Sequence, residues 1–385
     1  LGLDSDSVVL VFGTEGATDP DIYAALTKPD SAPACASETA NIAKKMPFSQ
    51  VVMCVDNLVS LAETGRDRSE YANSAYDPVF PLQEYQQRWV RTKASMAEKA
   101  IDTLVVADPG GIFYLTGFDG LGYYMPQYVI INTDVEFPVV VARGMDAAAG
   151  AFTTHLPLDH ILAYADHYVD NEELHPIQLV CKLLHRNGWA VDKTVALDMN
   201  SDYFTGRCYK EAIQYLGVIA KAVVDDKRLV NWVRIIKSPA EIEQIRIAAS
   251  IADETMRAAV KATTPEARGC DVAAAVMAAQ VHGCGKYGGV STAIPPIISI
   301  GSDSDAGHLE ATDKPLSLGF GGDQSGAPVV FELAGARRHY HCPMARTVFL
   351  GQPSAEYLAF IEVCMRGMKK LLAIATPGHT CHELY

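Results

Sequence analysis

Hydrophobic residues recur at helical spacing in two long stretches of the chain. The first runs through residues 82–101, where one helix face would carry Leu82, Tyr85, Trp89, Met96 and Ile101. The second begins at Ser238, which can cap a helix, with Pro239 at the first helical position and Glu241 completing a capping box. Its apolar stripe would be Ile242, Ile245, Ala249, Ala252, Met256 and Val260. Both stretches predict amphipathic helices.

Shorter apolar runs in the first half of the chain predict strands. Residues 103–107 read as a buried strand, and the Asp-Pro-Gly-Gly that follows predicts a turn at Asp108. Residues 128–133 and 137–142 are two further strand patterns joined by a short polar turn. Helix-like and strand-like segments then alternate to about residue 230, which indicates an α/β domain with a mostly buried sheet.

The second half of the chain reads as helices followed by strands. A helix is expected over residues 271–282, ending at Gly283, and strand patterns follow over residues 291–302 and 328–351. A last helix is expected over residues 354–375. We therefore divide the chain into residues 1–75, an N-terminal extension or fusion remnant, a domain of residues 76–230, and a domain of residues 231–385.

Charge and composition narrow the classes of partner. The net charge of −14 at pH 7 argues against binding to nucleic acid or anionic membranes and favours a small-molecule substrate. No apolar run reaches the ~18 residues of a membrane helix, and the first residues have no signal-peptide pattern. The nine cysteines form no CxxC pair, so we expect reduced thiols and a cytoplasmic location.

Motifs from Leu82 to Tyr385 carry a family resemblance. IKSPAEIEQIRIAA, the Gly-His pair ending at His308, and ARTVFLG occur in an order that resembles the creatinase/prolidase (M24, pita-bread) family. The resemblance implies a creatinase-like N-terminal α/β domain followed by an α+β pita-bread domain, truncated here because the family's domain continues past the last residue. Residues 1–30 separately resemble the C-terminal end of fold-type II PLP ammonia-lyases, which suggests a fusion remnant.

The same resemblance bears on metal binding. In metal-dependent members two hairpin aspartates, with a histidine and two glutamates further on, hold two metals that activate water. The matching hairpin positions here are Glu332 and Pro343, and the other ligands would lie beyond Tyr385. Proline has no side-chain donor atom, so we expect no metal and no other cofactor.

Four segments resemble the ectoine-hydrolase branch of the family, which is metal-free. They are YLTGFDGLGYYMPQ, DHYVDNEELHP, RLVNWVRIIKSP and VVFELAGARRHYHCPMARTVFLG. Two departures are an apparent insertion at residues 319–327 and the absence of a carboxylate in residues 281–291, which leaves the general base open. The branch implies hydrolysis of a C–N bond in the cyclic amidine ectoine, giving N-acetyl-2,4-diaminobutyrate.

The resemblance also implies site residues. Glu332, in an otherwise apolar strand, is the expected catalytic carboxylate, and His308 stands where creatinase has its catalytic histidine. Another interpretation of Glu332 is a structural ion pair with the hairpin arginines. Tyr124, Gln127, His341 and Arg346 are expected to bind substrate. Tyr124 and Gln127 match a loop that reaches into the partner's pocket in creatinase-like dimers, so a homodimer is expected, although ordinary interface packing would explain them too.

Two other functions remain open at this point. One is a metallohydrolase of the Xaa-Pro aminopeptidase or prolidase kind, against which Pro343 argues. The other is a non-catalytic, truncated scaffold that retains the dimer interface without a complete site.

Overall fold

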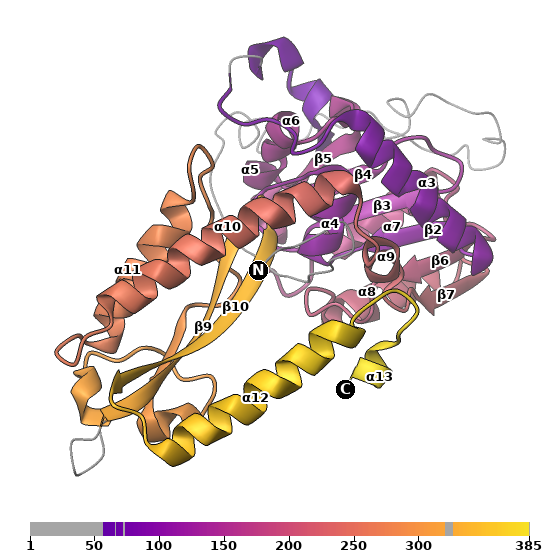
Figure 1. Ribbon diagram of the computed structural model, residues 1–385. Coiled ribbons are helices and arrows are strands. Elements are labelled where there is room, and N and C mark those ends of the chain that lie inside the picture. Colours follow the sequence, from indigo (N-terminus) through magenta and orange to yellow (C-terminus); the bar gives the residue numbers. More distant parts are fainter. Residues whose placement is uncertain (1–56, 66, 72–73, 320–325, 385) are drawn as a thin grey trace. The chain divides into compact units, whose positions relative to one another are not determined.

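The structure is a computed structural model that describes residues 57–384 apart from 66, 72–73 and 320–325 (Figure 1). The described residues form two compact units, which divide between Ile236 and Lys237. The predicted likeness of residues 1–30 to PLP lyases lies outside the described residues, as does most of the predicted insertion at residues 319–327.

The first unit is built on a seven-stranded mixed sheet. The strand order is β1-β5-β4-β3-β2-β6-β7. The pairs β1–β5, β2–β3 and β3–β4 are antiparallel, and β4–β5, β2–β6 and β6–β7 are parallel. The strands are β1 (Leu58–Ser60), β2 (Thr103–Val106), β3 (Tyr128–Asn132), β4 (Val139–Arg143), β5 (Ile161–Tyr164), β6 (Thr194–Leu197) and β7 (Ala222–Asp225). The predicted α/β architecture is confirmed.

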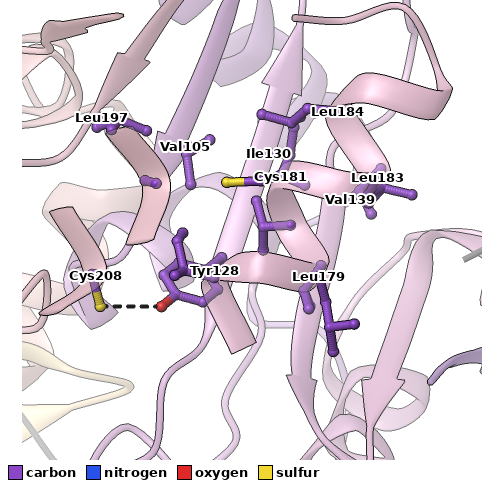
Figure 2. Close-up of a cluster of buried hydrophobic side chains, with 14 of the residues drawn as sticks. Val105, Tyr128, Ile130, Val139, Leu179, Cys181, Leu183, Leu184, Leu197 and Cys208 are labelled. Atoms are coloured by element: carbon purple, nitrogen blue, oxygen red, sulfur yellow. Dashed lines mark hydrogen bonds between the residues drawn. The ribbon is translucent and has the colours of Figure 1, made fainter. Parts of the chain in front are cut away.

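Helices cover this sheet and bury its side chains. They are α3 (Leu82–Glu98), α4 (Pro109–Thr116), α5 (Gly144–Ala147), α6 (Ala149–Thr153), α7 (Pro176–Arg186), α8 (Gly206–Leu216) and α9 (Leu229–Arg234), with 3-10 turns at Leu61–Thr64, Arg68–Tyr71, Leu158–His160 and Asp166–Tyr168. Residues of α7 and α8 pack on one face of the sheet, as Figure 2 shows around Tyr128 and Cys181. Within that core the Tyr128 hydroxyl lies 3.4 Å from the Cys208 sulfur.

Two local features of the first unit differ from the sequence predictions. The Asp-Pro-Gly-Gly segment is the start of α4 and not a turn, because the Asp108 carboxylate caps the helix by accepting the Gly111 N–H at 2.6 Å. Arg88 in α3 was not among the residues predicted to form the buried helix face, but it is completely buried. Its guanidinium lies between the Phe80 and Tyr114 rings and pairs with Glu84 at 3.0 Å.

The second unit combines a helix pair with a three-stranded antiparallel sheet of order β10-β9-β8. Its elements are α10 (Pro239–Ala262), α11 (Gly269–His282), β8 (Ile297–Ile300), β9 (Gly326–Arg337), β10 (Tyr340–Gly351), α12 (Ala355–Ile374) and α13 (Cys381–Leu384), with 3-10 turns at Gly301–Asp305 and Leu316–Gly319. In Figure 1, α10 runs beside the hairpin of β9 and β10. Among the described helices of both units, none has the length and apolarity that crossing a membrane requires.

The boundaries of α10 follow the predicted capping box. The Ser238 hydroxyl accepts the Glu241 N–H, and the Glu241 carboxylate accepts the Ser238 N–H. The predicted stripe was wrong at Val260, which is 46% exposed, because the buried face passes through Ala259 instead. The predicted strand over residues 291–302 is strand only over β8, since the two prolines before it have no N–H to donate.

Candidate functional site

The β9–β10 hairpin has two chemically different faces. Val329, Phe331 and Leu333 of β9 belong to the core that β9 shares with α10 and α11. Side chains alternate along a strand, so Glu332 projects from the opposite face. Directly opposed residues in antiparallel strands project to the same side, which places Ala345 of β10 and Ile297 of β8 beside Glu332.

Glu332 is partly buried and lacks the ion pair that a structural role would provide. Its carboxylate forms no hydrogen bond or ion pair with any residue that the structure describes. Arg346 stands opposite Phe331 and so projects from the other face of the hairpin; it is exposed and donates to the Ala345 carbonyl at 2.7 Å. Arg337 donates to the Gly288 carbonyl. The predicted catalytic role of Glu332 requires a carboxylate that is not paired with a cation. No described residue pairs with it.

Pro343 lies on the same face as Glu332. It stands opposite Ala334, which makes it the diagonal neighbour of Glu332 across the β9–β10 ladder. A second carboxylate at this position would complete a pair of neighbouring metal ligands, but proline offers no donor atom. Nor do the described residues contain any group of three or more His, Cys, Asp or Glu side chains able to hold a metal ion. The described hairpin therefore supplies Glu332 but no second ligand at the Pro343 position.

His341 projects from the Glu332 face as well, but its ring is enclosed. It is only 4% exposed, its Nε2 accepts the Ala293 N–H at 3.1 Å, and its Nδ1 lies 3.0 Å from the His339 carbonyl. Both contacts fit a neutral ring protonated on Nδ1. Burial lowers the pKa of His341 to about 4, which favours that neutral form. A substrate contact, as predicted from the sequence, would have to replace one of these two hydrogen bonds.

His308 follows the 3-10 turn after β8 and is exposed. Within the part of the chain that the structure describes, it makes no hydrogen bond or ion pair, and none connects it to Glu332. The strand β8 fixes where the loop that carries His308 begins, but not the position of the imidazole. The role of His308 as a proton shuttle therefore stays a prediction.

The remaining predicted site residues, Tyr124 and Gln127, lie in the first unit. Both belong to the segment of residues 118–127 between α4 and β3, which we call the Tyr124 loop. Tyr124 is 48% exposed, whereas Gln127 is 6% exposed and its Oε1 has no hydrogen-bond partner among the described residues. Their predicted contribution to a substrate pocket stays a prediction.

Two polar residues near these elements were missed by the sequence reasoning. Asp146 in α5 is 4% exposed, and its Oδ2 has no hydrogen-bond partner among the described residues. Burial raises the pKa of Asp146 to about 6, with Arg143 acting in the opposite direction. Ser299 in β8 lies on the Glu332 face and is also buried. Its hydroxyl has no hydrogen-bond partner among the described residues. Nothing in the runs MDAAAG and IISIG marks either residue as buried.

Together the two units define a creatinase-type protein with an α/β N-terminal domain and a pita-bread C-terminal domain. The family profiles agree: the creatinase/prolidase N-terminal domain matches residues 88–236, and metallopeptidase family M24 matches residues 243–385. The chain therefore belongs to the creatinase/prolidase family within M24, a family of hydrolases.

Individual relatives support the same placement. The chain is 33% identical to the ectoine hydrolase of Halomonas elongata over 79% of this chain and 75% of that protein. It is 36% identical to y4tM of Sinorhizobium fredii, described as a hydrolase/peptidase, over 78% of this chain and 74% of the relative. The crystal structure of the prolidase from Pyrococcus horikoshii matches with a TM-score of 0.61 at 20% identity, covering 77% of this chain and 75% of that one, and so shares the fold.

Proposed function

We propose that the chain is a metal-independent hydrolase that opens the cyclic amidine ectoine to N-acetyl-2,4-diaminobutyrate. The observation that carries the proposal is the hairpin: Glu332 presents a carboxylate without a described partner, and Pro343 removes the neighbouring metal ligand. The similarity to an ectoine hydrolase supports this choice of substrate.

Opening of the ectoine ring by water requires one group that acts as a base and one that acts as an acid. Water adds to the amidine carbon and one C–N bond of the ring breaks, leaving an acetamide on one nitrogen and a free amine on the other. Glu332 acts as base or nucleophile at the amidine carbon, and His308 carries the proton to the departing nitrogen. The partly buried position of Glu332 suits a cationic amidinium, because a carboxylate without a partner attracts a cation strongly where water is scarce.

The remaining predicted contacts complete the proposal. Tyr124 stacks on the planar amidinium and Gln127 accepts a hydrogen bond from it. Arg346 leaves β10 on the other face from Glu332, so it is not assigned to the substrate carboxylate. His341 contributes by shaping the hairpin face. A homodimer would supply the Tyr124 loop of one subunit to the other, in keeping with the family resemblance of that loop.

Proton NMR of the ring opening tests the catalytic carboxylate. Wild-type protein is expected to convert ectoine, and Glu332→Gln, which keeps the shape and removes the charge, is expected to lose about 100-fold or more of the rate, a typical contribution of general acid–base catalysis. Glu243→Gln, an exposed position on α10, is the matched control and should keep wild-type activity. Equal rates in Glu332→Gln and wild type would refute the assigned role.

Similarity to Xaa-Pro dipeptidases makes peptide hydrolysis the second candidate function. The same assay, run with an Xaa-Pro dipeptide and added Mn²⁺, distinguishes the two. Cleavage of the dipeptide without ectoine conversion would replace the proposal. Conversion of neither substrate by folded protein would favour a scaffold without catalysis.

A further inference from the structure

The Tyr124 loop presents its exposed tyrosine on a tight turn. The Met125 N–H donates to the Gly122 carbonyl at 2.8 Å, which closes a four-residue turn with Tyr124 at its third position. Next to it, the Tyr123 ring meets the Tyr203 ring edge-on, with 5.7 Å between centroids. The direction in which Tyr124 points therefore depends on where the first residue of the turn, Gly122, is held.

Gly122 rests directly on the side chain of Asp146. A Cβ added at Gly122 would lie 2.2 Å from both Cγ and Oδ2 of Asp146, so only glycine fits this contact. Arg143 does not neutralise the carboxyl group by an ion pair; its guanidinium pairs with Asp166 at 2.8 Å. The buried Asp146 carboxyl thus serves as the surface on which the turn packs.

The rest of the loop is fixed to the same pair of short helices. The Asp119 N–H donates to the Thr153 hydroxyl of α6 at 3.2 Å. A Cβ at Gly117 would lie 2.9 Å from the Thr153 carbonyl, and one at Gly120 would lie 3.4 Å from the Asp146 carbonyl. With its earlier residues fixed in this way, the segment that can move is the turn itself, and its support is Asp146.

We propose that Asp146 is a positioning residue that holds Gly122 and thereby sets the place of Tyr124 for substrate binding. The proposal rests on the role given to Tyr124 in the proposed function. It names a residue that does not touch the substrate but determines how tightly the substrate is held.

The contact also responds to pH. The groups that face the Asp146 carboxyl electrostatically are Arg143, Asp166 and Tyr164. Because burial raises the pKa of Asp146 to about 6, the carboxyl is neutral below that pH and ionised above it. An ionised carboxylate without a hydrogen bond is costly to keep buried, so the turn loosens as pH rises through about 6.

Hydrogen–deuterium exchange of the Tyr124 loop tests the contact without requiring turnover. After correction for intrinsic exchange, wild type should exchange faster at pH 7 than at pH 5 by about tenfold, the equivalent of one pKa unit. Asp146→Asn should remove this pH dependence, and Asp146→Ala and Gly122→Ala should raise exchange at both pH values. Gly206→Ala, where nothing lies within 4 Å of the added Cβ, is the control and should behave as wild type.

Kinetics with ectoine provide the second measurement. Asp146→Ala should raise KM with little change in kcat, as a Tyr124→Ala variant should, whereas Asp146→Asn should keep a low KM that no longer varies with pH. Unchanged loop exchange in Asp146→Ala, or faster exchange spread equally over α7, would overturn the inference. If wild type does not convert ectoine, the proposed function fails, while the exchange experiment still decides whether Asp146 holds the turn.

Discussion

The packing of α10 on the hairpin allows one substitution to be predicted in detail, namely Gly335→Ala. A Cβ at Gly335 would lie 2.2 Å from the Ala248 carbonyl oxygen and 2.3 Å from the Ala252 nitrogen, both in the backbone of α10. Ordinary contacts begin at 3.4 Å, so the helix and β9 would have to separate by about 1.2 Å (3.4 − 2.2). Neither partner is a flexible side chain that could turn aside.

Such a separation would loosen the core around Phe331, which is completely buried. Forcing a methyl group into a packed interface costs about 1–3 kcal/mol, and backbone contacts on both sides favour the upper end. A loss of about 3 kcal/mol would lower the Tm by about 6–12 °C for a unit of this size.

Thermal unfolding followed by far-UV circular dichroism measures the effect on the whole chain, because both units contain helices. Fluorescence reports separately on the first unit, because Trp89, Trp189 and Trp232 all lie there. Gly367→Ala is the matched control, since nothing lies within 4 Å of its added Cβ and alanine favours the helix α12. Equal Tm values for Gly335→Ala and Gly367→Ala would refute the close packing of α10 on β9.

Two further predictions concern stability. Ser238→Ala removes the capping box of α10 and should lower the free energy of unfolding by about 1 kcal/mol in urea titrations, whereas Ser250→Ala, exposed on the same helix, should have little effect. His341 has a folded-state pKa of about 4, below its usual 6.5, so the unfolded chain binds its proton first. The contribution of His341 to the free energy of unfolding is complete above pH 6.5 and decreases as the pH falls towards 4, by up to about 3 kcal/mol. His341→Gln should remove that pH dependence and the exposed His282→Gln should keep it; identical pH profiles would contradict the assignment.

Local sequence signals predicted the elements whose ends are fixed by neighbouring residues. The capping box at Ser238 marked the start of α10, and the strand pattern over residues 328–351 marked the β9–β10 hairpin. The same local reasoning failed at Asp108, because an Asp-Pro pair can open either a turn or a helix and the Gly111 hydrogen bond decides between them.

Contacts between distant residues could not be read from local patterns. Glu332 was expected from the family resemblance and from its charge in an apolar strand, but its face and its neighbours follow from the strand register. Asp146 gave no signal, since its importance comes from a glycine more than twenty positions earlier in the chain. His341 was expected to bind substrate, but two hydrogen bonds to the backbone enclose its ring.

Hydrolysis of ectoine without a metal can be tested with a single experiment. Purified protein is treated exhaustively with a chelator, the metal content is checked, and formation of N-acetyl-2,4-diaminobutyrate from ectoine is followed by proton NMR. We expect the same rate before and after chelation, because Pro343, the diagonal neighbour of Glu332, has no donor atom for a metal. Activity that disappears on chelation and returns with Mn²⁺ would contradict it.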